Sequence, residues 1–297
     1  MKSPPVKAIV ALCITGVLGG FAPIFMKIAF KEFTPVQIVF TRFFFSFIIL
    51  FSIALFTKKL TFDKNDIPHI ILASLLFSCN IFFFVFGLQY TTSIASQLMY
   101  LLTPTFVIIL SHFFLNSSVT SKYVLSIITG LLGGIILIIG SNVSRLTNSL
   151  GTTLGNGIIL GAVFSWSLYI IISKKLSKKY HPLSLIVANS AVVGSIAMIL
   201  LFTQRIHIFS LYFKASPQVI ISLLFLIIFN SVLFFFLYQW SIKLASPFAV
   251  SISTYLSPLA AGLLAVPLFG EQITLQLIIS ALLIGVSSYL TFKKERK

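Results

Sequence analysis

Acidic residues are nearly absent from this sequence, which has 5 Asp and Glu against 21 Lys and Arg in 297 residues. Every acid falls in a loop or at the end of an apolar run, and the set comprises Glu32, Asp63, Asp66, Glu271 and Glu295. Proton relays inside membranes are built from acids within apolar segments. The scarcity of acids therefore excludes a relay that relies on a carboxylate at the centre of such a segment.

Cysteine and histidine are also scarce, with 2 Cys and 4 His. Both cysteines lie in apolar runs, where a thiol behaves as a small hydrophobe. The histidines are scattered without the spacing of metal ligands, and no G-x-x-x-x-G-K-[ST] loop for nucleotide phosphates occurs. No Ser and His pair lies at matched depth for nucleophilic catalysis. We therefore expect neither an enzyme nor a bound cofactor or metal.

Apolar residues make up 58% of the chain and charged residues only 9%, whereas soluble domains average about 45–50% apolar. A helix needs roughly 20 apolar residues to cross a bilayer, and runs of that length recur from Ala8 to Phe292. We interpret the first run as an uncleaved helix, because it exceeds the apolar core of about 7–15 residues in a signal peptide. The sequence predicts an all-α polytopic membrane protein with spans at 8–30, 35–57, 67–90, 93–115, 122–141, 155–173, 183–203, 217–241, 247–269 and 274–292.

The net charge of +16 would suggest nucleic-acid binding in a soluble protein. Here most basic residues fall in alternate loops and near both termini, which is the bias of cytoplasmic segments. We expect a multi-pass protein of the cytoplasmic (inner) membrane with both termini in the cytoplasm. Its partners would be the lipid bilayer and a small-molecule substrate, not nucleic acid.

The two halves of the chain resemble one another. Gln97–Thr120 aligns with Ser251–Thr274 at an offset of 154, so that Pro104 matches Pro258. A second match, at an offset of 147, pairs Lys27 through Pro35 with Lys174 through Pro182. Residues 1–146 and 147–297 then form two repeats within one transmembrane domain. Because each repeat has five helices, the second enters the membrane in the opposite sense, as in the inverted repeats of secondary transporters.

With these motifs the chain resembles the drug/metabolite transporter superfamily, specifically its ten-helix EamA-type members. The resemblance rests on Leu256-Ser257-Pro258, on Phe269-Gly270-Glu271 followed by Thr274, and on Arg42 seven residues after Pro35. The first half departs from the second, with Asn116-Ser117-Ser118 where the second has Gly270-Glu271-Gln272. The resemblance implies transport of a small organic metabolite by alternating access, with amino acids or related amines favoured and export more common than uptake.

Polar residues inside the spans are the candidates for substrate binding. Arg42 is the sole basic residue well inside a span, and either binds an anionic group or has a structural role. Asn189 aligns with Arg42, and Asn80 aligns with Asn230, where interhelical hydrogen bonding is the alternative. Aromatic and polar residues that share helix faces or lie beside Pro258 complete the set: Gln97, Tyr100, Trp166, Tyr169, Thr254 and Tyr255.

Three other features have structural interpretations. Pro104 and Pro258 predict a shared kink that acts as a hinge in the fourth and ninth spans. Glu271 is expected to cap the helix that follows it, with proton coupling as the alternative. Pairs with G-x-x-x-G spacing predict close helix packing, within the bundle or between the copies of a homodimer: Gly16/Gly20, Gly130/Gly134 and Gly157/Gly161.

The sequence leaves three functions open. The favoured one is a secondary active or facilitative transporter of an amino-acid-sized metabolite. A carrier or exchanger of nucleotides, S-adenosylmethionine or nucleotide sugars is the alternative within transport. Arg42 is the only cation well inside a span, whereas a diphosphate should require several buried cations. A membrane scaffold that transports nothing is the third.

Overall fold

The computed structural model describes residues 5–115, 121–143, 150–204 and 209–295. This part of the chain is helical and contains no strand. In chain order the elements are α1 (Val6–Ala29), α2 (Pro35–Phe56), the 3₁₀ turn η1 (Lys64–Asp66), α3 (Ile67–Leu88), α4 (Ser93–Tyr100), α5 (Thr103–Leu115), α6 (Ser121–Val143), α7 (Thr153–Leu176), α8 (Pro182–Thr203), α9 (Phe209–Lys214), α10 (Pro217–Phe225), the π-helix η3 (Leu226–Phe234), α11 (Phe235–Leu244), α12 (Pro247–Ser251), the 3₁₀ turn η4 (Ile252–Tyr255), α13 (Leu256–Phe269) and α14 (Leu275–Glu295).

The predicted all-α polytopic fold is confirmed. Seven helical segments are long and apolar enough to cross a membrane, and three shorter apolar helices occupy the remaining predicted spans in the part of the chain that the structure describes. The short helix α9, between α8 and α10, was not predicted. The motif residues 116–118 of the first half lie outside the described residues.

Proline and threonine mark where several helices begin. Proline is the first residue of α2, α8, α10 and α12, where its missing N–H would have had no helical partner. Thr34 and Gln37 form a reciprocal capping box at the start of α2, with N–H to oxygen distances of 3.4 and 2.7 Å. Thr92 and Thr152 cap α4 and α7. The loop chemistry of the sequence therefore sets the helix boundaries.

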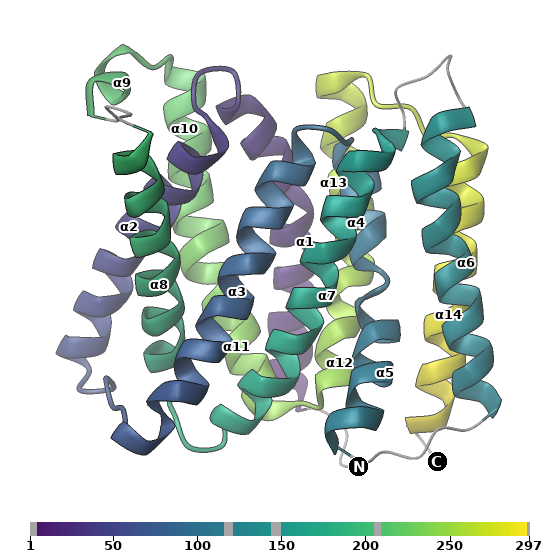
Figure 1. Ribbon diagram of the computed structural model, residues 1–297, viewed down its shortest axis with the longest axis horizontal. Coiled ribbons are helices and arrows are strands. Elements are labelled where there is room, and N and C mark those ends of the chain that lie inside the picture. The colour runs from purple at the N-terminus through teal and green to yellow at the C-terminus, as the bar shows by residue number, and fades with distance from the viewer. Residues whose placement is uncertain (1–4, 116–120, 144–149, 205–208, 296–297) are drawn as a thin grey trace.

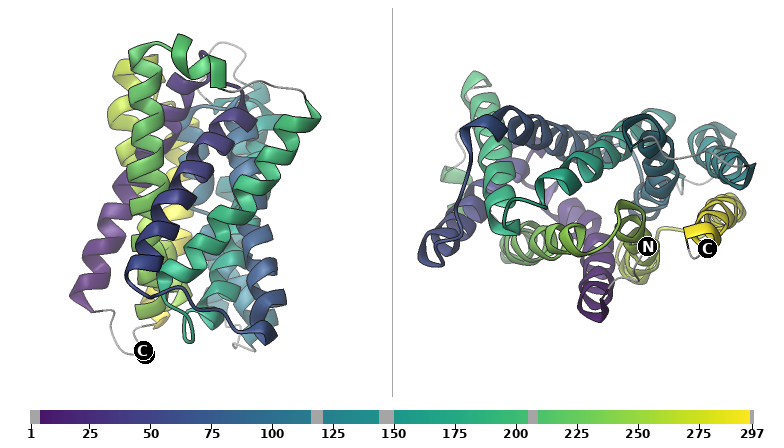
Figure 2. Two further views of the ribbon diagram at one scale, coloured as in Figure 1. Left: turned by 90° about the vertical axis from the view of Figure 1, so that its left-hand side faces the viewer. Right: turned by 90° about the horizontal axis from the view of Figure 1, so that it is seen from below.

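Helices of the first half pack directly on helices of the second half. Corresponding spans pair as α2 with α8 and as α6 with α14, while α3 packs on α7 and α1 on α13. Figure 1 shows that α1 begins and α14 ends at the same end of the bundle, which we call the terminal end; the opposite end is the distal end. Viewed along the bundle, α6 and α14 stand together at one edge (Figure 2).

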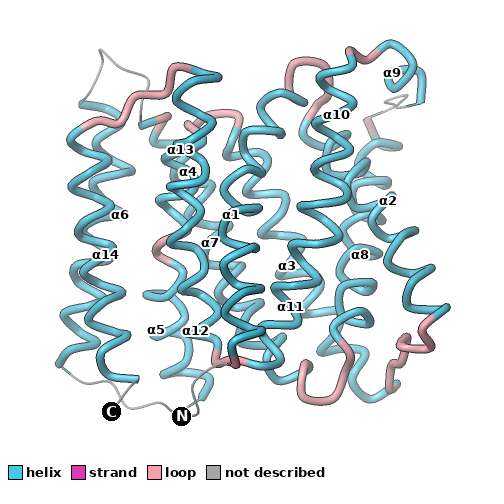
Figure 3. The backbone as a smooth tube through the Cα atoms, turned by 180° about the vertical axis from the view of Figure 1, so that it is seen from behind, coloured by secondary structure: helices cyan, strands magenta, loops and turns pink. Residues whose placement is uncertain are grey.

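Two of the spans leave the α-helical conformation where the sequence predicted kinks. The fourth span divides into α4 and α5, visible as a loop halfway through the bundle (Figure 3). The ninth divides into α12 and α13, joined by the tight turn η4. Pro104 and Pro258 fall in the first turns of α5 and α13, where a helix needs no N–H from them. Each proline therefore starts a new helix, and the side chain of Thr103 bonds the freed carbonyl of Tyr100 at 2.6 Å.

Glycine allows α1 to lie directly on the ninth span. A Cβ atom at Gly16 would come within 2.7 Å of both the Ser253 carbonyl oxygen and Leu256 Cβ, and one at Gly20 would overlap the backbone of Ser257. The pair Gly130/Gly134 is equally crowded, but Gly157 faces open space. In that third pair a Cβ at Gly161 would lie 3.4 Å from the Phe83 ring, which is an ordinary contact, so Gly157 makes no close contact within the bundle and packing between copies stays a prediction.

We expect Gly20→Ala to lower the thermal stability of the purified protein in detergent, because the added methyl group must push α1 away from α13, at a cost of about 1–3 kcal/mol. The matched control is Gly157→Ala, which adds the same group where nothing lies within 4 Å and should melt at the same temperature or higher. Equal melting temperatures for the two variants would contradict the close contact.

Candidate substrate cavity

A cavity lies inside the bundle and is walled by helices of both halves. The centre of a water molecule can occupy about 80 Å³ of it, and roughly 10–15 Å³ of such space holds one water. It is therefore large enough for several waters or a small organic molecule. Its lining comprises Thr15, Gly16, Gly19, Ala22, Met26, Arg42, Asn80, Ile81, Phe84, Gln97, Tyr100, Trp166, Asn230, Phe234, Phe235, Tyr238, Ser253, Thr254 and Ser257.

Seven of the ten residues proposed from sequence to bind substrate line this cavity. They come from α2, α3, α4, α7, η3 and η4, and are Arg42, Asn80, Gln97, Tyr100, Trp166, Asn230 and Thr254. The other three, Tyr169, Asn189 and Tyr255, do not line it. Neither Pro104 nor Pro258 borders the cavity, although both follow helix breaks near it.

Arg42 is the charged group of the cavity wall, and only 1% of it is exposed. Its guanidinium donates from Nε to Ser231 Oγ at 3.1 Å and from Nη2 to Asn230 Oδ1 at 2.5 Å. Nη1 contacts the thioether of Met26 at 3.7 Å, a weak acceptor. All of these partners are neutral. The positive charge is thus hydrogen-bonded but not neutralised by the described residues around it.

The acids lie away from this charge. Asp63 and Asp66 lie between α2 and α3, where Lys179 contacts one oxygen of each at 2.7 Å and, by donating these hydrogen bonds, holds the pKa of both carboxyls below its ordinary value. Glu32 accepts a hydrogen bond from the backbone N–H of Ser216 at the start of α10. No acidic residue lines the cavity in the part of the chain that the structure describes.

Two side-chain amides of the wall, Asn80 and Gln97, differ in the number of hydrogen bonds that they make with described residues. Asn80 donates to the Tyr100 hydroxyl at 2.5 Å and to the carbonyl of Ala162 at 2.9 Å, which ties α3 to α4 and α7. Gln97, one turn before Tyr100 on α4, makes no side-chain hydrogen bond with any described residue and lines the same cavity. Its amide can therefore bond a ligand without first giving up a protein partner.

Aromatic rings form one side of the cavity. The Trp166 ring lies 4.9 Å from that of Tyr238 and stacks on Tyr169 at 5.2 Å, centroid to centroid. Phe234 stacks on Tyr238 at 5.7 Å. Such a wall suits an apolar or planar part of a ligand, while the amides and Arg42 supply the polar contacts.

Tyr169 and Asn189 belong to a buried network outside the cavity lining. The Asn189 amide donates to the Tyr169 hydroxyl at 2.7 Å, which in turn donates to Gln239 Oε1 at 2.8 Å. Ser74 and Ser173 complete the network with bonds of 2.9 Å each. Although Asn189 aligns with Arg42 in the repeat, its side chain bonds Ser74 of α3 and Tyr169 of α7 and does not line the cavity.

Tyr255 and its neighbour Thr254 face different spaces. Thr254 lines the central cavity, but its neighbour Tyr255 lines a separate apolar groove of about 620 Å³, together with Pro258 and residues of α4 and α14. The Thr254 hydroxyl is itself bonded to the Ser251 carbonyl at 2.7 Å. The short segment η4 and α13 therefore separate the cavity from this groove.

Sequence reasoning missed several residues of the wall. Phe234 and Tyr238 follow Asn230 at intervals of four residues and line the same cavity. That spacing was a usable signal, since residues four apart share a helix face. The partner Ser231 was not predictable in this way, because it directly follows Asn230 and adjacent residues of an α-helix do not share a face. Both reach Arg42 from the π-helical segment η3.

Comparison with known proteins places this architecture in a family. The chain matches the EamA-like transporter family over residues 6–139 and again over 153–293. It is 25% identical over 301 residues to the uncharacterized transporter YoaV of Bacillus subtilis (strain 168), covering 98% of this chain and 99% of that protein. An uncharacterized transporter of Clostridium kluyveri is 27% identical over 270 residues, covering 89% and 85%.

A solved crystal structure has the same fold, with a TM-score of 0.70, 14% identity and coverage of 98% of each chain. The family matches span both halves, and the relatives are named as transporters. The chain therefore belongs to the EamA-like transporter family.

Proposed function

We propose that this transporter carries a small organic metabolite that bears a carboxylate, with amino-acid-sized compounds favoured, and that it works by alternating access. The substrate would bind in the central cavity. Transport would be facilitative, by exchange, or coupled through something other than a buried acid at the membrane centre. The breaks beside Pro104 and Pro258 would allow α4 and α13 to move against the rest of the bundle.

The observation that carries this proposal is the buried charge of Arg42. Placing a cation at membrane depth costs from about 2.5 kcal/mol upward, and its partners Asn230 and Ser231 are neutral. An anionic ligand would supply the missing countercharge, and a guanidinium bonds a carboxylate through two parallel N–H groups. An anionic group on the substrate is thus the best complement to this wall.

The rest of the wall supports an amino-acid-sized ligand over a nucleotide. The Trp166 and Tyr238 rings could hold an apolar side chain, and Gln97 could accept from an ammonium group. A diphosphate would call for several cations, whereas Arg42 is the only Lys or Arg among the described lining residues. Nucleotide-type substrates and S-adenosylmethionine remain comparison ligands for the experiment below.

We further propose the cytoplasmic (inner) membrane as the location, with the terminal end of the bundle in the cytoplasm. The support is the excess of Lys and Arg in the loops assigned to that side. α1 begins and α14 ends at one end of the bundle, as this topology requires (Figure 1).

We expect a carboxylate-bearing ligand to raise the melting temperature of the purified protein. At a ligand concentration 100 times the dissociation constant, binding adds about 2.7 kcal/mol to the free energy of unfolding. The sharpest ligand pair is phenylalanine and phenethylamine, which differ only in the carboxylate. Phenylalanine should stabilise and be exchanged by counterflow in proteoliposomes, and phenethylamine should do neither. The same assay with other amino acids, S-adenosylmethionine and nucleotides defines the range.

The matched variants are Arg42→Met and Arg42→Lys. Arg42→Met should abolish the difference in stabilisation between phenylalanine and phenethylamine. Arg42→Lys should keep part of that difference, because the charge remains but the bidentate geometry does not. Equal stabilisation by the amine and the amino acid would contradict a carboxylate site. No stabilisation or exchange by any compound would instead favour a scaffold.

Tyr169→Phe should lower the melting temperature without changing the dissociation constant of a cavity ligand. The change leaves the buried Asn189 amide N–H without its acceptor, at a cost of about 1–3 kcal/mol, and removes one of the two donors to Gln239 Oε1. Tyr169 does not line the cavity. The control is Tyr289→Phe, at a ring that is 61% exposed, which should melt like the wild type. A tenfold change in ligand affinity for Tyr169→Phe would place its hydroxyl at the substrate.

A further inference from the structure

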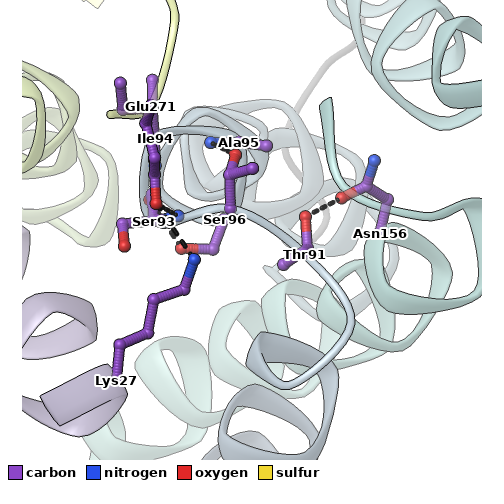
Figure 4. Close-up of polar contacts among 9 residues, drawn as sticks. Lys27, Thr91, Ser93, Ile94, Ala95, Ser96, Asn156 and Glu271 are labelled. Carbon is purple, nitrogen blue, oxygen red and sulfur yellow. Dashed lines mark hydrogen bonds and ion pairs between the residues drawn. The ribbon is translucent and has the colours of Figure 1, made fainter. Parts of the chain in front are cut away.

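Glu271 lies at the distal end of the bundle and binds groups from two other helices (Figure 4). One carboxylate oxygen contacts the Lys27 ammonium at 3.0 Å and accepts the N–H of Ser93 at 2.7 Å. The other accepts the N–H of Ile94 at 3.0 Å. Only 8% of Glu271 is exposed. The sequence predicted that Glu271 caps the next helix, but it caps α4 instead, and Thr274 caps α14.

The geometry of this carboxylate depends on the turn that precedes it. Gly270 ends α13 in the left-handed conformation, with φ of 64°, which is accessible to glycine at little cost. The chain then turns back, and Glu271 points at the N-terminus of α4, where a negative charge is favoured by the unpaired N–H groups. We call the contacts of Glu271 with Lys27, Ser93 and Ile94 the clasp. It joins the end of α1, the start of α4 and the end of α13.

These three elements are the ones that carry much of the cavity wall. Met26 lies next to Lys27 on α1, Gln97 lies one turn into α4, and Ser257 belongs to α13. α4 has only eight residues and is separated from α5 by a break, so holding its first turn fixes the whole short helix. The start of α4 is buried beneath the clasp, with Ser93 at 0% and Ile94 at 6% exposure.

The terminal end of the bundle is held differently. Lys174, which the repeat aligns with Lys27, donates to the carbonyls of Ile242, Lys243 and Ala245 at 2.8, 3.2 and 2.7 Å. No carboxylate takes part in these contacts. The terminal end has its own ion pairs, from Lys179 to Asp63 and Asp66, but all three side chains are 28–52% exposed and cap no helix of the cavity wall. The buried carboxylate, with a side chain only 6% exposed, belongs to the distal end.

We propose that Glu271 is a latch that holds the distal end of the cavity closed and so biases the protein toward the state that opens at the terminal end. It is a positioning residue, because it acts through α1 and α4 and does not line the cavity. This inference rests on the alternating-access part of the proposed function and not on the substrate class. To open the distal end, α1, α4 and α13 must separate, which breaks the ion pair and both backbone hydrogen bonds.

The test measures access to the cavity without any substrate. Cys13 and Cys79 are exposed on the bundle surface and would be replaced by Ala, and Ala22→Cys would place a thiol on the cavity wall. In proteoliposomes whose orientation is read from a C-terminal tag, a membrane-impermeant maleimide is added on one side at a time. In Lys27→Met and Glu271→Gln, labelling from the distal side should be about tenfold faster and labelling from the terminal side slower.

The tenfold change corresponds to about 1.4 kcal/mol, the size of a lost helix cap. In the double variant the fold increase in distal labelling rate should be smaller than the product of the two single-variant increases, because both substitutions remove the same ion pair. Lys31→Met is the matched control: this lysine lies at the same end, makes no ion pair with a described residue, and should leave labelling unchanged.

Unchanged distal labelling in both latch variants would overturn the proposal. An equal increase from both sides would also overturn it, since it indicates general loosening and not a shift between two states. If Glu271→Gln does not fold, Lys27→Met still tests the latch, because it keeps the cap of α4. Since no ligand is used, failure here is distinguishable from failure of the carboxylate site.

Discussion

A bilayer offers no hydrogen bonds to a peptide group, and this constraint decides where the chain can depart from the α-helix. The described spans depart from it at three places inside the bundle: the break at residues 101–102, the π-helical segment Leu226–Phe234, and the 3₁₀ turn Ile252–Tyr255. Each adjoins the central cavity, which is lined by Tyr100, Asn230 and Thr254 among others. Irregular backbone in the described spans therefore lies beside the cavity, where it forms part of the cavity wall.

The same constraint explains how polar side chains are distributed. Threonine and serine hydroxyls of the wall are mostly bonded to carbonyls of their own helices, such as Thr254 to Ser251 and Ser253 to Val250. They therefore contribute little binding capacity of their own. Arg42 and Gln97 differ, one by its uncompensated charge and the other by its unbonded amide, and they define the chemical character of the cavity more than the number of polar residues does.

The sequence was sufficient for the membrane spans, the ten-helix class and the helix starts at proline, because hydrophobic length and loop chemistry are local properties. It also identified seven residues of the wall, since polar groups within membrane spans usually face the bundle interior or a cavity. It could not fix rotation about the helix axis, so Tyr255 was grouped with Thr254 although they face different spaces. It could not show that Glu271 reaches α4, because that contact joins residues 178 positions apart.

The glycine contact between α1 and the ninth span has a mechanical consequence. Where Gly16 and Gly20 lie against η4 and α13, even one added methyl group on α1 would overlap its neighbour. A contact of backbone against backbone cannot adjust by changing side-chain rotamers, and close-packed interfaces rearrange in discrete steps. α1 and the broken helix therefore keep this contact whole or lose it in one step, together with the hydrogen bond that Ser257 Oγ donates to the Gly16 carbonyl at 2.9 Å.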